Sequence, residues 1–280
     1  MVDLDLPDPL KTPLWQWYPT EEQGWKTTTH ASLKEALSDV RVGWSAYHKC
    51  QVVLFTASRG QVGVIEYPSG KCLWEGMVGV SPHAAELLPN GDMIVAASGG
   101  GKGELGGVHY LKLTTHGSYT EIASYPLYGA HGAVWDTKEQ ILWASGTDDV
   151  VAYAVTADGL TLLEGKGVKI PCSYGHDLMQ DLSDPDILWV SPSPYVYQFS
   201  KRKNALFTEF LHSEVIHPLL RAKGIASFPD GVVIWVAYGR HTSTEHPDHF
   251  SAFWPGKGVV TYTEEHAGWN KIRVFSDHHM

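Results

Sequence analysis

A short β-rich segment that ends in a small residue occurs five times along the chain. The copies are Val52–Ser58, Met93–Ser98, Ile141–Ser145, Ile187–Ser191 and Val233–Ala237, and their last residues are 40, 47, 46 and 46 residues apart. Each copy is preceded by one further strand-like run and followed by two more, with Gly, Pro and Asp turns between them. Four short strands in a unit of about 40 to 50 residues are typical of a β-propeller blade. The sequence therefore predicts an all-β propeller.

The number of blades depends on two runs near the ends of the chain. The repeats define five blades at residues 41–80, 81–128, 129–173, 174–214 and 215–264, which leaves the strand-like runs 14–18 and 268–275 unassigned. Pairing these two runs would close the ring and remove the open edges of the array. We therefore expect one domain over residues 1–280, with an N-terminal extension and closing strand at 1–40 and blade repeats at 41–280. The ring would have six blades, the sixth reduced, and five blades are the alternative. One short helix is expected within residues 20–38.

Composition excludes several classes of partner and location. The chain has 21 Lys and Arg against 31 Asp and Glu, and this formal net charge of -10 would repel nucleic acid and anionic membranes. Its apolar runs fall far short of the roughly 20 residues that a membrane span needs. The first residues lack the basic and apolar regions of a secretory signal. The three cysteines have no paired spacing. A cytoplasmic protein with free thiols is expected.

Histidine recurs where the aligned repeats lead into each inner strand. His83, His131 and His176 hold this position in blades two to four, Lys223 holds it in blade five, and His266 precedes the C-terminal run. The inner strands of a propeller line a central channel and run the same way, so these side chains should meet at one mouth of the channel. One such histidine is usually only a hydrogen-bonding turn residue. A turn has no need of imidazole in successive blades, however, so the recurrence points to a shared polar site.

This ring of imidazoles indicates a metal site. Imidazole is the commonest metal ligand in proteins, and His83, His131 and His176 would suit Zn²⁺, Mn²⁺ or Fe²⁺ with one position open for water or substrate. His266 would be a fourth ligand or a base. Without a metal, the same ring would act as general acid and base. The polar loop 239–249 holds a rival cluster of histidines and Asp248, for which a solvated loop is the preferred interpretation.

Charged residues accompany the histidines on the same set of strands. Glu86 and Asp177 follow two of them closely, and Lys223, Lys271 and Arg273 add positive charge. We expect Arg273 or Lys223 to pair with a carboxylate of the substrate, while Glu86 and Asp177 take part in catalysis. The alternative for the two carboxylates is that they cap turns or orient the histidines.

Two runs of sequence resemble a known group of propellers. They are His-Ala-Ala-Glu-Leu-Leu-Pro-Asn-Gly-Asp-Met-Ile-Val-Ala-Ala-Ser, from His83 to Ser98, and His-Ala-Gly-Trp-Asn-Lys-Ile-Arg, from His266 to Arg273. Both resemble an uncharacterised β-propeller family known only as a domain of unknown function. The resemblance runs over most of the chain, implies a propeller and supplies no activity. Metal-bearing histidine clusters also occur in the mouths of oligogalacturonate lyases and carotenoid oxygenases, which are analogies of site and not of descent.

These observations favour an enzyme. We expect a metal-assisted or histidine-dependent lyase, isomerase or hydrolase that acts on a small polar, carbohydrate-derived substrate at the channel mouth. Aromatic residues near the strand starts would stack on a sugar ring, with core packing between blades as the alternative; they are Trp44, Tyr128, Tyr174 and Trp269. The alternative function is a non-catalytic scaffold for protein partners, which would show an apolar or charged patch on the rim instead. A calcium-dependent lactonase ranks last, because the ring is rich in nitrogen ligands.

Overall fold

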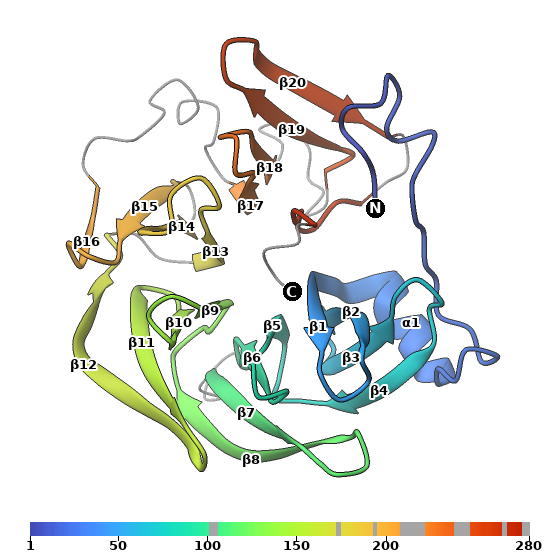
Figure 1. The fold of residues 1–280 in the computed structure, drawn as a ribbon, viewed down its shortest axis with the longest axis vertical. Helices are drawn as coiled ribbons and strands as arrows, with labels where there is room; N and C mark the ends of the chain where they lie inside the picture. The colour runs from blue at the N-terminus through green and yellow to red at the C-terminus, as the bar shows by residue number, and fades with distance from the viewer. Residues whose placement is uncertain are drawn as a thin grey trace.

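Five antiparallel sheets of four strands stand in a ring in the computed structural model of the chain (Figure 1). The structure describes residues 1–100, 106–171, 175–192, 195–207, 222–237, 247–264 and 268–275. Within each sheet the strands follow sequence order, and the first strand is innermost. This is the arrangement of a five-bladed β-propeller, which confirms the expected fold class and selects the five-bladed alternative.

Each blade is a simple meander. Its strands, from the innermost outwards, are β1 (Leu37–Ser45), β2 (Cys50–Ala57), β3 (Gln61–Glu66) and β4 (Cys72–Met77) in blade 1; β5 (Pro82–Leu87), β6 (Met93–Ala97), β7 (Gly107–Leu113) and β8 (Tyr119–Pro126) in blade 2; β9 (Gly132–Asp136), β10 (Ile141–Ser145), β11 (Asp149–Thr156) and β12 (Gly159–Lys169) in blade 3; β13 (Gly175–Gln180), β14 (Ile187–Pro192), β15 (Tyr197–Ser200) and β16 (Ala205–Leu206) in blade 4; and β17 (Ala222–Ser227), β18 (Val233–Ala237), β19 (His249–Trp254) and β20 (Gly258–Thr263) in blade 5.

The repeated β-rich segments of the sequence are the second strands of the blades. Every residue of β6, β10 and β14 is buried, because each of these strands has a neighbouring blade on both of its faces. A strand that is covered on both faces reads as a continuous apolar run without polar alternation. Trp143 and Trp189 fill the space between blades at this level. The outermost strands face solvent on one side, and most of β20 is exposed.

The ring closes between blade 5 and blade 1 without a sixth sheet. Residues 14–18 and 268–275, which were expected to pair as a reduced sixth blade, form no strand in the described structure. Both segments instead lie in the gap between these two blades (Figure 1). Trp15 and Trp17 pack against the apolar face of blade 1, and Ile272 and Val274 pack against that of blade 5. The two terminal segments thus cover the faces that a further blade would cover.

One helix, α1 (Thr27–Ala36), precedes blade 1 in the described residues, within the range 20–38 where a helix was expected. Its last residue is followed directly by β1, so blade 1 begins at residue 37 and not at 41. Among the helices of the described residues, none combines the length and the apolar character that a membrane crossing requires.

Candidate functional site

The residues predicted for the channel mouth owe their positions to a recurring irregularity of the first strands. Near the start of β1, β5, β13 and β17 the pairing with the second strand shifts its register. His83, His176 and Lys223 lie at these shifts, and His131 directly precedes β9, where its backbone N–H donates to the carbonyl of Ser145. Such a bulge leaves a residue unpaired and re-aims its side chain. Blades 2 to 5 therefore present equivalent positions at one mouth of the channel, as the repeat alignment predicts.

Three imidazole rings meet at this mouth. The rings of His83 and His131 stack with centroids 4.0 Å apart and planes 18° from parallel, and the ring of His176 meets that of His131 edge-on at 5.8 Å. Nδ1 of His131 donates to the carbonyl of Gly129 at 2.7 Å, which leaves Nε2 as a proton acceptor. Nε2 of His83 lies 3.1 Å from the hydroxyl of Ser81. All three histidines are partly exposed, so they are open to a small molecule at the mouth.

The stacking determines how these rings can relate to a metal ion. An imidazole binds a metal through a lone pair in the plane of its ring, at about 2.1 Å from the nitrogen. The nearly parallel planes of His83 and His131 do not meet within that distance, so the two rings as placed cannot bind the same ion. Across the described ranges, no three His, Cys, Asp or Glu residues are arranged to hold a metal. His266, the fourth predicted ligand, lies outside the described residues.

The imidazoles of the mouth are uncharged at neutral pH. Burial, together with the positive charges of Lys271 and Lys223, lowers the pKa of His131 to about 4 and the pKa of His176 to about 3. Burial, the neighbouring imidazole of His131 and Lys271 also hold the pKa of His83 well below its usual value. Neutral imidazoles beside Lys223 form a surface that accepts hydrogen bonds and attracts anions.

A buried network of ion pairs lies next to the histidines. Nη1 of Arg273 is 2.8 Å from Oδ2 of Asp177, and Nη2 is 2.8 Å from Oδ1 of both Asp177 and Asp39. Nζ of Lys271 lies 3.4 Å from Oδ1 of Asp177 and donates to the backbone carbonyls of the two stacked histidines at 3.0 and 3.4 Å. Both carboxylates are fully buried. Burial alone would raise the pKa of Asp177, but Arg273 and Lys271 outweigh it and hold that pKa well below its usual value.

The network extends through Arg41 to a third carboxylate. Arg41 on β1 donates from Nε to Asp39 at 3.1 Å, from Nη1 to Glu86 at 3.2 Å and from Nη2 to the carbonyl of Leu178 at 3.3 Å. Burial raises the pKa of Glu86 to about 7, and the positive charge of Arg41 offsets this only in part. Glu86 is therefore divided between its neutral and ionised forms near neutral pH.

The predicted site residues thus divide into two layers. One layer lies at the channel mouth and consists of His83, His131, His176 and Lys223. The other layer is the buried ion network, which includes Glu86, Asp177 and Arg273. Both terminal nitrogens of Arg273 contact aspartates, and only 5% of its side chain is exposed, so a substrate meets little of it. Asp177 and Glu86 each bond to an arginine, and Asp177 also accepts the backbone N–H of Ile225 at 3.1 Å.

Sequence reasoning missed Asp39 and Arg41. They lie two residues apart on β1, so they share one face of the strand, and both are buried. Blade 1 has no histidine at the start of its inner strand, because Ser38 lies at the corresponding register shift. A signal was nevertheless present: two oppositely charged residues at a spacing of two within an otherwise apolar run.

Two tyrosines are exposed on the same side as the histidines. Tyr128 lies in the turn that leads to His131 and is 64% exposed, and Tyr195 lies in the loop between β14 and β15 and is 50% exposed. Trp44, which was expected near a strand start, lies at the opposite end of β1. Trp269 lines the gap between blades 1 and 5, and Tyr174 lies outside the described residues. Of the four aromatic residues named from the sequence, Tyr128 therefore remains as a candidate for ligand stacking.

Replacing Glu86 by glutamine should change how stability depends on pH. The pKa of Glu86 is raised in the folded protein, so the unfolded chain binds fewer protons and stability falls as pH rises from about 5 to 7. The change is up to about 2 kcal/mol, reduced by solvent because 17% of the side chain is exposed. Urea denaturation of the wild type and E86Q at pH 5, 6 and 7 measures it. The exposed Glu22→Gln is the control, and identical pH profiles for wild type and E86Q would contradict the assignment.

Comparison with known proteins identifies a family but no activity. The model of DUF6528, described as a family of unknown function, matches residues 11–242. No curated protein matches the chain. The match covers the three described histidines, Lys223 and the carboxylates of the network, and it ends before the segment that contributes Lys271 and Arg273.

Proposed function

The chain belongs to this family of unknown function, and we propose that it is a histidine-dependent enzyme that moves a proton on a small sugar acid at the channel mouth. The observation that carries the proposal is the contact of three neutral, partly exposed imidazoles from three successive blades. Side chains that meet in this way, with pKa values shifted by burial and by specific charges, are typical of functional sites.

His131 is assigned as the base. Its Nδ1 donates to Gly129, which fixes the ring orientation and leaves the lone pair of Nε2 available. Because its pKa is near 4, the ring carries no proton at Nε2 at neutral pH, and in this scheme the negative charge of the bound substrate raises that pKa and so strengthens the base. The stacked ring of His83 limits rotation of His131. The surroundings of His131 supply the orientation and the protonation state that a general base needs, and the charge of the bound substrate brings its pKa closer to neutral pH.

The charges around the mouth favour a substrate with a carboxylate. Lys223 holds the position in blade 5 that histidine holds in blades 2 to 4, and its charge lowers the pKa of all three imidazoles. The same charge attracts an anion, so Lys223 is the residue that we assign to the substrate carboxylate. Arg273 has a different role in this scheme: it positions the first strands through Asp39 and Asp177.

An exposed aromatic residue favours a sugar-like body for the substrate. Tyr128 directly precedes Gly129, whose carbonyl orients His131, and most of its ring is open to solvent. An aromatic face next to a polar site can stack on the apolar face of a sugar ring. In the proposed step the carbon next to the carboxylate loses its proton to Nε2 of His131, and the C–H electron pair enters an enolate. Return of the proton gives an isomerase, and loss of a neighbouring oxygen substituent gives a lyase.

The test uses the full chain in D₂O with glucuronate, galacturonate and gluconate, and with glucose as the uncharged comparison. Saturation-transfer NMR measures binding, and loss of the proton signal next to the carboxylate measures exchange. We expect the sugar acids, but not glucose, to bind, and at least one of them to exchange its proton. His131→Gln should abolish exchange, a loss of at least about a hundredfold. Tyr128→Ala should weaken binding, whereas Tyr47→Ala, which changes an exposed tyrosine at the other end of blade 1, should not.

Two outcomes would overturn the proposal. Absence of both binding and exchange for every sugar acid would favour the scaffold for protein partners. A metal-assisted version requires His83 or His131 to turn from the stacked position, so the metal content of tag-free protein is measured in parallel. Near-stoichiometric Zn, Mn or Fe that disappears in His131→Gln would replace the metal-free base with a metal centre. We expect no such stoichiometric metal.

A further inference from the structure

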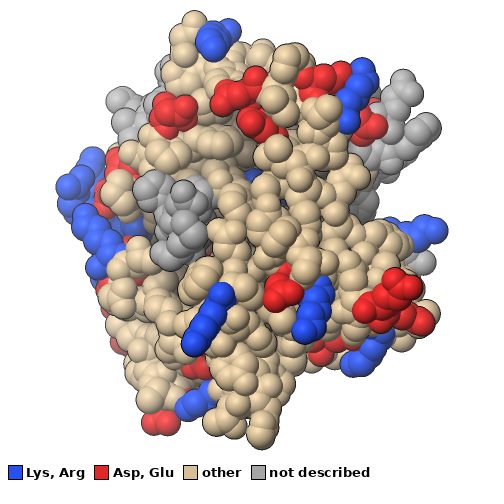
Figure 2. All heavy atoms as spheres, turned by 45° about the vertical axis from the view of Figure 1, so that its right-hand side comes forward, with Lys and Arg blue, Asp and Glu red and all other residues tan. Residues whose placement is uncertain are grey.

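A large cleft separates blade 5 from blade 1, and none of His83, His131 and His176 lines it. Its volume is about 1120 Å³, and Figure 2 shows a hollow in the upper half of this side of the molecule with acidic side chains grouped around it. Small-molecule sites usually have volumes of about 300 to 1,000 Å³, so the cleft is large enough for a ligand of several rings or a long chain.

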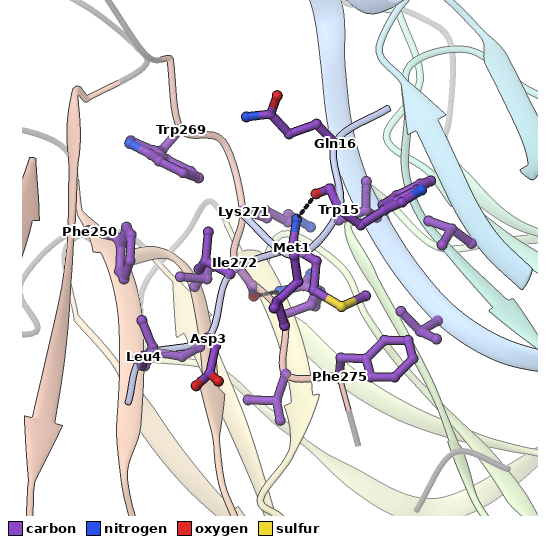
Figure 3. A pocket seen from close by; sticks show the side chains of 18 of the residues that line it. Met1, Asp3, Leu4, Trp15, Gln16, Phe250, Trp269, Lys271, Ile272 and Phe275 are labelled. Atoms are coloured by element: carbon purple, nitrogen blue, oxygen red, sulfur yellow. Dashed lines mark hydrogen bonds between the residues drawn. The ribbon is translucent and has the colours of Figure 1, made fainter. Parts of the chain in front are cut away.

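Apolar side chains line most of the cleft. One wall comes from blade 1 and the N-terminal segment, with Trp15, Trp17, Val42 and Phe55. The opposite wall comes from blade 5 and the C-terminal segment, whose Phe275 reaches across to Tyr67 of blade 1. Figure 3 shows Phe250 and Trp269 on one side, Trp15 and Phe275 on the other, and Met1 between them, where its amine donates to the carbonyl of Trp15 at 2.5 Å. Binding of an apolar molecule to such a surface is favourable, because it removes apolar area from water.

Two N–H groups of residues in this lining lack a partner, Nε1 of Trp269 and Nε of Arg273, and the second lies beside the ion pairs at the inner end of the cleft. Nε of Arg273 is buried and forms no hydrogen bond with any described residue, although the other two nitrogens of the same side chain are paired. The side chain is 95% buried, since 5% of it is exposed, and the residue lines the cleft. A buried N–H without a partner costs about 1 to 3 kcal/mol, so a ligand oxygen is a favourable acceptor for it once a small shift of the Arg273 side chain opens Nε to the cleft.

The charges favour an uncharged ligand over an anion. Asp39 and Asp177 already neutralise Arg273 and Lys271, so the inner end of the cleft offers a spare N–H but no spare positive charge. The outer lining includes Asp3, Asp5 and Asp230, which repel anions. We infer that this cleft binds an uncharged, largely apolar molecule that carries one carbonyl or hydroxyl oxygen, and that the oxygen accepts a hydrogen bond from Nε of Arg273.

The first experiment asks whether the cleft binds such a molecule. Prodan, an uncharged aromatic ketone whose emission shifts to the blue in apolar surroundings, is titrated with the full chain. Saturable binding with a blue shift is expected. Val42→Trp fills the cleft from blade 1 and should weaken binding at least about tenfold, while Val259→Trp, the same substitution at an exposed site on β20 outside the cleft, should leave it unchanged. His131→Gln should also leave it unchanged, which separates this site from the proposed catalytic mouth.

The second experiment tests the oxygen and needs no variant. 2-Acetylnaphthalene, 2-ethylnaphthalene and 2-naphthoate have similar size and differ in their oxygen atoms and charge. Each is used to displace prodan from the wild type. We expect the ketone to compete about tenfold better than the hydrocarbon, which accepts no hydrogen bond, and better than the anion.

Four results would contradict the inference. The first is that the wild type shows no saturable prodan binding. The second is that Val42→Trp is folded, as judged by circular dichroism, and still binds prodan as tightly as the wild type. Equal competition by all three naphthalenes would remove the role of Arg273 Nε. Sedimentation of both proteins completes the test, because a wild-type dimer that becomes monomeric in Val42→Trp would mean that a second copy of the chain covers the cleft.

Discussion

Replacing Arg273 by methionine is expected to lower the free energy of unfolding by about 3 to 5 kcal/mol. Arg273 contacts both Asp39 and Asp177, whose carboxylates are fully buried. Without it, Asp39 keeps Arg41 at 3.1 Å, whereas Asp177 keeps Lys271 as its nearest cation, at 3.4 Å. The single contact with Lys271 does not replace the two-point contact of Arg273 with the buried carboxylate of Asp177, and removing one partner of a buried pair costs far more than the pair contributes. Urea denaturation at pH 7.5, followed by circular dichroism, measures the loss.

Matched variants separate the network from a general effect of losing arginine. Arg202→Met removes an arginine that is 80% exposed near Asp186 and should change stability by less than about 0.5 kcal/mol. Adding Asp177→Asn to Arg273→Met removes the carboxylate that has lost its arginine and should restore part of the loss. A loss below about 1 kcal/mol for Arg273→Met would show that the network contributes little to folding.

Acid should destabilise the protein through the histidines of the mouth. The pKa values of His131 and His176 are about 4 and 3 when folded and about 6.5 when unfolded, so the unfolded chain binds more protons below pH 6.5. The effect is absent above pH 6.5 and grows as pH falls towards the folded values. At pH 5 each histidine costs about 2 kcal/mol, and the two together about 4 kcal/mol. Urea denaturation between pH 7.5 and 5 follows this loss.

The comparison that isolates the histidines uses a double variant, His131→Gln with His176→Gln. Glu86 acts in the opposite direction over this range in both proteins, so the difference between their pH profiles is the histidine contribution. The wild type should lose about 4 kcal/mol more than the double variant by pH 5. His116→Gln, which changes an exposed histidine on another loop, should follow the wild type. Parallel profiles for wild type and double variant would mean that the imidazoles are not held neutral.

The sequence repeat made the propeller fold predictable. How the ring closes between its last and first blades was not predictable. Strands that lie between two blades must be apolar throughout, so segments such as Ile141–Ser145 recur at the period of the blades. Residues 14–18 and 268–275 alternate like strands, but alternation does not identify a hydrogen-bonding partner. In the structure these segments contribute side chains such as Trp17 and Ile272 to the faces of blades 1 and 5, and they form no sheet. Side-chain packing across the gap between blades 5 and 1 determines how the ring closes, and this packing cannot be read from a local stretch of sequence.

The site was predictable in position but not in geometry. Equivalent places in the repeat put His83, His131 and His176 at one mouth, because the bulges recur with the blades. Spacing along the chain carries no information on ring orientation, so the stacking that separates the lone pairs of His83 and His131 could not be foreseen. The partners of Arg273 were equally hidden, since Asp39 is more than 200 residues away in the sequence and lies in a blade that has no histidine at the mouth position.

The segment that carries Lys271 and Arg273 gives the ring a seam. It passes so close to blade 5 that a Cβ at Gly224 would lie 2.9 Å from Cα of Lys271, and it reaches across to Asp39 in blade 1. Each blade forms from residues that are near one another in sequence. The contact of Arg273 with Asp39 instead joins residues that are far apart in sequence, so it costs more chain entropy and is expected to form late. The contact between blades 5 and 1 is therefore expected to be the last part of the ring to form. Unfolding is expected to begin by opening the seam, while blades 2 to 4, each held by a neighbour on both sides, stay folded longer.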